Sequence, residues 1–161
     1  MKKYKIEIKW AVLFTLVALL WMYFEKSMGW HDELISEHAI YTNFFSIVAI
    51  AVYLFALIDK RNNYYQGYMS WKEGFVSGLV LSAFVALLTP LSQWITHALI
   101  TPDYFANAIS FAVSSGRLTQ EEAEAYFNFK SYLVQSFIFS FVVGAVTSAI
   151  VALFVKRQAK A

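Results

Sequence analysis

Three histidines are the side chains of this sequence best suited to bind a metal ion. His31 and His38 stand in the acidic segment HDELISEH, and His97 follows a long apolar run. Imidazole nitrogens and carboxylate oxygens are ligands that Zn²⁺ and related divalent ions accept. The pattern is weak, because no HExxH motif is present and His31 and His38 are seven residues apart. The sequence leaves two interpretations open: a metal site at these three histidines, or a solvated acidic loop.

Other kinds of catalysis have little support in the residue types. The chain contains no cysteine, which excludes thiol nucleophiles, disulfides and thiolate metal sites. A hydrolase or acyl transferase needs a nucleophile beside a base, and the serines at regular spacing in apolar segments are explained by packing. We therefore predict that the protein is not an enzyme and that it has no cofactor.

The composition places these residues in a membrane. Apolar residues make up 59% of the 161 residues and charged residues only 15%, a balance that does not suit a soluble protein. A helix needs about 20 apolar residues to cross the hydrocarbon layer of a bilayer. Four stretches reach that length, and they predict spans at about 6–25, 39–58, 73–100 and 131–155.

The first span requires two charged residues near its start. We expect the side chains of Glu7 and Lys9 to turn toward the lipid headgroups. A secretory signal peptide is the alternative, since the chain opens with a basic segment followed by an apolar one. Against it, the apolar run ends in Trp21, Met22 and Phe24, where a signal peptidase requires small residues.

Positive charge predicts the orientation of the spans. Ten of the 13 Lys and Arg residues flank the two termini and the segment between the second and third spans, and three lie on the opposite side: Lys26, Arg117 and Lys130. Because Lys and Arg are retained in the cytoplasm during insertion, both termini should be cytoplasmic. The basic residues form no single patch, so we expect no nucleic-acid partner.

Two spans carry strips of small residues at steps of four. In the third span the strip is Gly74, Gly78, Ser82 and Ala86, and in the fourth it is Ser136, Ser140, Gly144 and Ser148. Small residues let two helices approach closely in lipid, where association depends on van der Waals packing and weak hydrogen bonds. We predict that the third and fourth spans cross along these strips. Self-association of two copies through one strip is the alternative.

The third span is too long to cross the membrane straight. Its charge-free run is broken by Pro90, which removes one helical hydrogen bond and needs space for its ring. We predict a kink at Pro90.

The segment 101–129 predicts a helical hairpin outside the membrane. Thr101 stands where a capping hydroxyl would start an amphipathic helix, and Gly116 where that helix would end. Thr119 and Glu122 have the spacing of a capping box for a second helix, which could run without a break into the fourth span.

The chain also resembles an uncharacterised family of short bacterial membrane proteins with four spans. The resemblance rests on MKKYKIEIKW, HAIYTNFF, FALIDKRNNYYQGYMSWKEGFVSGL and ITPDYFANAISFAVSSGRLTQEEAEAYFN. It implies a four-span protein of the bacterial inner membrane, and it implies no activity or site residues.

These observations together predict an all-α integral membrane four-helix bundle with an extracytoplasmic amphipathic hairpin between spans three and four. The expected function is that of a non-catalytic structural or accessory subunit, with a small transporter as the alternative. The expected partners are the lipid bilayer and another membrane or periplasmic protein or a second copy of the chain.

Overall fold

The computed structural model describes residues 2–158, and regular structure within them is helical. The helices are η1 (Lys2–Tyr4), α1 (Lys5–Ser27), α2 (Ile35–Tyr41), η2 (Thr42–Phe44), α3 (Phe45–Asn63), α4 (Trp71–Ile95), η3 (Thr96–Ile100), α5 (Tyr104–Ser114), α6 (Gln120–Tyr126) and α7 (Phe129–Val155). η3 is a π-helical turn that continues α4.

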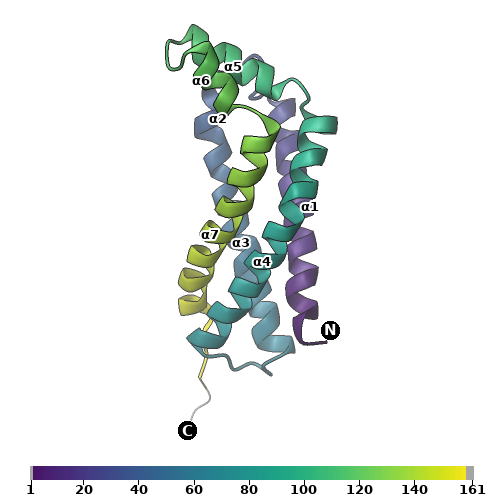
Figure 1. Ribbon diagram of the computed structural model, residues 1–161. Helices are drawn as coiled ribbons and strands as arrows, with labels where there is room; N and C mark the ends of the chain where they lie inside the picture. The colour runs from purple at the N-terminus through teal and green to yellow at the C-terminus, as the bar shows by residue number, and fades with distance from the viewer. Residues whose placement is uncertain (1, 159–161) are drawn as a thin grey trace.

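Four helical segments are long and apolar enough to cross a membrane. They are Lys5–Ser27, Ile35–Asn63, Trp71–Ile100 and Phe129–Val155. Figure 1 shows them side by side in a bundle, with α5 and α6 across one end and the start of α1 and the end of α7 at the other. We call these the cap end and the terminal end. The prediction of an all-helical, four-span bundle is confirmed.

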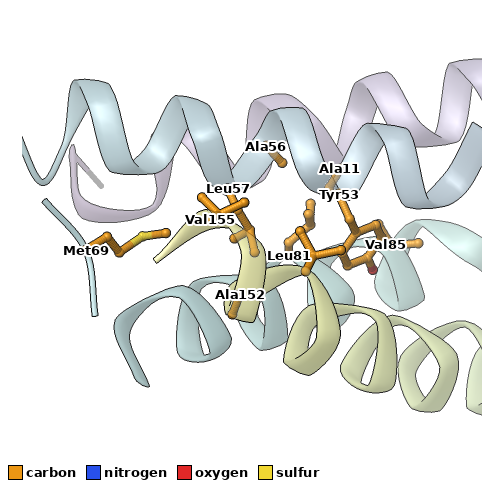
Figure 2. Packing of buried hydrophobic residues seen from close by; sticks show 10 residues of the cluster. Ala11, Tyr53, Ala56, Leu57, Met69, Leu81, Val85, Ala152 and Val155 are labelled. Carbon is orange, nitrogen blue, oxygen red and sulfur yellow. The ribbon is translucent and has the colours of Figure 1, made fainter. Parts of the chain in front are cut away.

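The apolar core lies toward the terminal end of the bundle. All four long helices and the α3–α4 loop contribute to it, and Figure 2 shows side chains from each converging on Leu57 and Leu81. Its buried members are Ala11, Tyr53, Ala56, Leu57, Met69, Leu81, Val85, Val151, Ala152 and Val155. Large apolar residues on the outward faces, such as Phe139 and Phe154, are mostly exposed. That is the arrangement expected where lipid is the solvent.

The α4–α7 seam, the contact between these two helices, is the most extensive in the bundle. In its terminal half the two strips of small residues meet. A Cβ atom added to Gly78 would lie 2.3 Å from the hydroxyl oxygen of Ser148, and one added to Gly144 would lie 2.5 Å from that of Ser82. The contact at Gly74 is looser, since an added Cβ would lie 3.2 Å from the Cβ of Ala152 and 3.1 Å from the Cε of Met69. No side chain larger than hydrogen fits at Gly78 or Gly144 unless the helices separate.

The cap half of the seam is held by side-chain hydrogen bonds instead. The hydroxyl of Thr89 donates to Ser140 at 3.2 Å, and the amide of Gln93 donates to Ser136 at 2.9 Å. α4 continues through Pro90 to Ile95, and Ala86, whose carbonyl would have bonded the missing amide, is buried.

Glu7 is buried at the terminal end, which corrects the expectation that its side chain turns to the headgroups. It is 3% exposed, and its Oε1 lies 2.8 Å from the ammonium of Lys60 and accepts a 2.8 Å hydrogen bond from Ser77. Lys60 stands in the last turn of α3 and also donates to the carbonyl of Lys3 at 2.8 Å. A cation and a hydroxyl from neighbouring helices replace the water that the carboxylate loses. We call Glu7, Lys60 and Ser77 the Glu7 cluster.

The last described residues are tied to the α3–α4 loop. The backbone amide of Met69 donates to the carbonyl of Arg157 at 2.9 Å, and the amide of Arg157 donates back to Met69 at 2.8 Å. Arg61 donates to the carbonyl of Val155 at 3.0 Å, which satisfies an acceptor left free at the end of α7. We call the Met69–Arg157 pair the terminal bridge.

The cap end differs from the sequence expectation at two joints. Thr101 does not cap α5: the π-helical turn brings its amide to the carbonyl of Thr96 at 2.8 Å, and its side chain is buried. α5 begins at Tyr104 instead. The second helix of the hairpin could have continued into the fourth span, but α6 ends at Tyr126 and α7 begins at Phe129, where the side chain of Asn128 caps α7 by accepting from the amide of Ser131.

The capping box of α6 is present as predicted. Thr119 accepts a hydrogen bond from the amide of Glu122, and the carboxylate of Glu122 accepts from the amide of Thr119 at 2.9 Å. These bonds lower the pKa of Glu122 below its ordinary range.

Candidate functional site

Glu25 is the centre of the polar cluster at the cap end. It lies in the last turn of α1, which ends at Ser27, and it is fully buried. The chain then turns at Gly29, whose φ of 78° is a conformation that glycine adopts without strain. The amide of Trp30 bonds back to the carbonyl of Glu25 at 3.2 Å, so the residue after it, His31, is directed under the end of the helix.

Two histidines converge on one oxygen of Glu25. His31 Nε2 lies 3.0 Å from Glu25 Oε2, and His38 Nε2, from α2, lies 3.3 Å from the same oxygen. One ligand atom from each of the three residues lies within 4.8 Å of the other two. The other carboxylate oxygen accepts a hydrogen bond from the indole of Trp21, one turn earlier on α1. We call Glu25, His31 and His38 the Glu25 cluster.

α5 closes the Glu25 cluster from the cap side. The hydroxyl of Tyr104 lies 3.5 Å from His38 Nδ1 and 3.1 Å from the hydroxyl of Tyr132. The amide group of Asn107 donates to the carbonyl of His31 at 3.0 Å and so holds the α1–α2 loop against α5. Burial raises the pKa of Tyr104 above its ordinary value.

The predicted site residues separate into two groups. His31 and His38 come together, with rings packed edge to face at 5.0 Å between centroids. His97 lies outside the Glu25 cluster: its Nε2 is 3.1 Å from Gln93 Oε1, and its ring stacks on Phe105 at 4.2 Å. All three histidines border the ring of Tyr104.

Sequence reasoning did not select Glu25 or Tyr104. Glu25 ends an apolar run, six residues before His31, and that position reads equally well as a helix end in water. The sequence does contain one indication of this cluster, which is a carboxylate at the membrane boundary followed closely by two histidines. Tyr104 is separated from His38 by 66 residues, so no local pattern connects them.

A groove lies between α5 and α6 on the outside of the cap. It has a volume of about 560 Å³ and is lined by Ala106, Ile109, Ser110, Val113, Ser114, Gln120 and Glu124. Three of the five lining residues on α5 are apolar, and the two on α6 are polar. A second, smaller recess of about 260 Å³ lies beside His97, Trp94 and Phe105.

The fold and these sites define a multi-pass helical membrane protein with a folded helical cap. Over residues 9–157 the chain matches the model of the family described as "Protein of unknown function (DUF4199)", and it belongs to that family. No curated protein and no solved structure matches it.

Proposed function

We propose that this protein is a non-catalytic accessory subunit of the bacterial inner membrane that presents its α5–α6 hairpin to a partner protein outside the cytoplasm. The observation that carries the proposal is the hairpin itself. α5 and α6 form an ordered, separately capped unit beyond the spans, with an open groove of about 560 Å³ between them. Connecting segments with this degree of order frequently carry binding functions.

The orientation is part of the proposal. Both described chain ends lie at the terminal end, opposite the hairpin (Figure 1), which supports a topology with both ends on one side of the membrane. The excess of Lys and Arg on that side favours the cytoplasm. The hairpin then faces the periplasm, where it can meet a periplasmic domain or the outer part of another membrane protein.

The bonding of two strip serines, Ser82 and Ser148, supports a packing role for them; Ser77, outside the strips, donates instead to the carboxylate of Glu7. The hydroxyl of Ser82 donates to the carbonyl of Gly78 at 2.8 Å, and that of Ser148 donates to Gly144 at 2.6 Å. Both hydroxyls are therefore bonded to their own helix rather than to a base that would activate them.

The α4–α7 seam favours a different protein as partner over a second copy. Gly78 and Gly144 are covered by residues of the neighbouring helix, so the small strips leave no surface for self-association at those positions.

Site-specific photo-cross-linking in native membranes tests the proposal. A photoreactive residue at Ser110, in the groove, should form a discrete adduct with one other protein, whereas the same residue at the lipid-facing position Val146 should not. Equal patterns from the two positions, or an adduct of two copies of the chain, would contradict it. A reporter fused to the carboxyl terminus checks the orientation and should be active in the cytoplasm.

A small transporter is the second candidate, and the Glu7 cluster favours it. An ionisable residue buried within a span is the type of group that carries protons or ions, and Glu7 Oε2 is buried without a hydrogen-bond partner among the described residues. Proteoliposomes with a pH-sensitive dye inside and an imposed membrane potential would measure proton flux. Transport requires flux in the wild type that Glu7→Gln abolishes; flux equal to that of empty liposomes rejects this candidate.

A further inference from the structure

We propose that the Glu25 cluster is a binding site for one divalent transition-metal ion, with Glu25, His31 and His38 as its protein ligands. The inference goes beyond the proposed binding role of the hairpin, because it concerns the opposite face of α5 and a different ligand. Two imidazoles and one carboxylate form a ligand set used for Zn²⁺ and other borderline ions, with further positions left for water.

The separations between the ligand atoms are close to those of a metal site. An ion with bonds of about 2.0–2.1 Å in a tetrahedral arrangement holds neighbouring ligand atoms about 3.3 Å apart. The two histidine-to-carboxylate separations are 3.0 and 3.3 Å, and all three ligand atoms fit within 4.8 Å.

Outer contacts hold two of the three proposed ligands, Glu25 and His38, while His31 Nδ1 has no hydrogen-bond partner among the described residues. The hydroxyl of Tyr104 faces the outer ring nitrogen of His38 at 3.5 Å, so that the other nitrogen points toward Glu25. The indole of Trp21 holds the second oxygen of Glu25. Outer contacts of this kind fix the tautomer and direction of the metal ligands.

The charge and the accessibility of the Glu25 cluster also suit a metal ion. Glu25 and His31 are almost completely buried, whereas the side chain of His38 is 19% exposed, so His38 is the accessible member of the cluster. The nearest cationic side chain in sequence, Lys26, is paired with Asp32 and is not directed at Glu25. A divalent ion supplies the positive charge that a buried carboxylate requires.

A metal titration of the full-length protein in detergent micelles tests the site. After treatment with a chelator, the wild type should bind one Co²⁺ per chain with visible absorption typical of mixed nitrogen and oxygen ligands, and Zn²⁺ should displace it. Mg²⁺ should not compete, because it prefers an all-oxygen octahedral site. Zn²⁺ should also raise the midpoint of thermal unfolding.

Point variants of the proposed ligands test which residues bind the ion. Glu25→Gln and His38→Asn should each weaken Zn²⁺ binding at least tenfold, while the matched controls Glu33→Gln and His97→Asn should stay within twofold of the wild type. Helicity measured by circular dichroism identifies variants that fail to fold. The proposal is overturned if the folded wild type shows no saturable binding of Zn²⁺ or Co²⁺. It is equally overturned if folded Glu25→Gln binds like the wild type, or if Glu33→Gln loses binding as Glu25→Gln does.

Discussion

The two ends of α1 each bury a glutamate, and they neutralise it differently. At the terminal end, Glu7 is paired with the ammonium of Lys60 at 2.8 Å. At the cap end, Glu25 is surrounded by His31, His38 and the indole of Trp21. A lysine keeps its charge at neutral pH, whereas the charge of a histidine depends on its surroundings or on a bound ion. The Glu7 cluster therefore contains its own cation, whereas the Glu25 cluster is suited to an exchangeable ligand.

The two halves of the α4–α7 seam also differ between the terminal end and the cap end. Near the terminal end it is closed by glycines at contact distance, and the apolar core lies beside it. Near the cap end it depends on two side-chain hydrogen bonds, and α4 passes through Pro90 into a π-helical turn. π-Helical turns occur frequently at functional sites. Close packing is thus concentrated at one end of the bundle and titratable side chains with two histidines at the other.

The largest expected effect comes from breaking the ion pair at the terminal end. Lys60→Met leaves Glu7 buried without its cation, which should lower the free energy of unfolding by about 3–5 kcal/mol. The double variant Glu7→Gln/Lys60→Met should lose much less, because no uncompensated charge remains. Unfolding by SDS titration in mixed micelles measures both. A double variant no more stable than Lys60→Met would show that lost packing, not charge, causes the effect.

The second prediction compares the two halves of the α4–α7 seam. Gly78→Val places methyl groups where Ser148 already lies and should cost about 1–3 kcal/mol through overpacking. Ser136→Val removes one interhelical hydrogen bond and should cost about 0.6 kcal/mol. The same SDS titration ranks the two variants. Equal losses would mean that the cap half of the seam is as tightly packed as the terminal half.

Tyr104→Phe should have a smaller effect, confined to the cap. It removes the hydroxyl between His38 and Tyr132 and leaves the hydroxyl of Tyr132 without that partner, at a cost of about 1–2 kcal/mol. Hydrogen exchange followed by mass spectrometry should show faster exchange in α2 and α5 and no change around Glu7. Faster exchange along the whole of α1 would contradict this separation of the two ends.

The smallest effect is expected at the start of α6. Thr119→Ala removes the capping hydroxyl and should cost about 1 kcal/mol of local helix stability, seen as faster amide exchange in Gln120–Tyr126. Lowering the pH should also destabilise the start of α6. The pKa of Glu122 is lower in the folded helix than in the unfolded chain, so its contribution is complete above the ordinary glutamate pKa and is lost as the pH falls through the folded value. Glu121→Gln is the matched control.

The sequence predicts this fold well where the signal is local, and less well where residues meet across the bundle. Hydropathy is a property of one segment, so the four spans could be found without a structure. The pairing of Glu7 with Lys60 joins two helices, and no spacing rule predicts it. From the sequence alone, Glu7 could equally well contact the lipid headgroups. Its burial becomes evident only from the positions of α3 and α4 next to α1.

At the cap end, too, the sequence predicts contacts between neighbouring residues better than contacts between separate segments. The capping box at Thr119 depends on two residues three apart and was predicted from the sequence. Thr101 has the same residue type, but the wider turn before it determines where its amide and side chain point. Likewise, His31 and His38 could be named as candidate ligands from their neighbourhood, whereas Glu25 joins them only through the turn at Gly29.

The terminal bridge has a consequence for biogenesis. Met69 leaves the ribosome almost ninety residues before Arg157, so their paired hydrogen bonds cannot form until the final helix has been synthesised and inserted. Until then the loop before α4 lacks these partners and is open to cytoplasmic proteases if the termini face that side. Closure of the bridge is therefore one of the last steps in assembling the terminal end of the bundle.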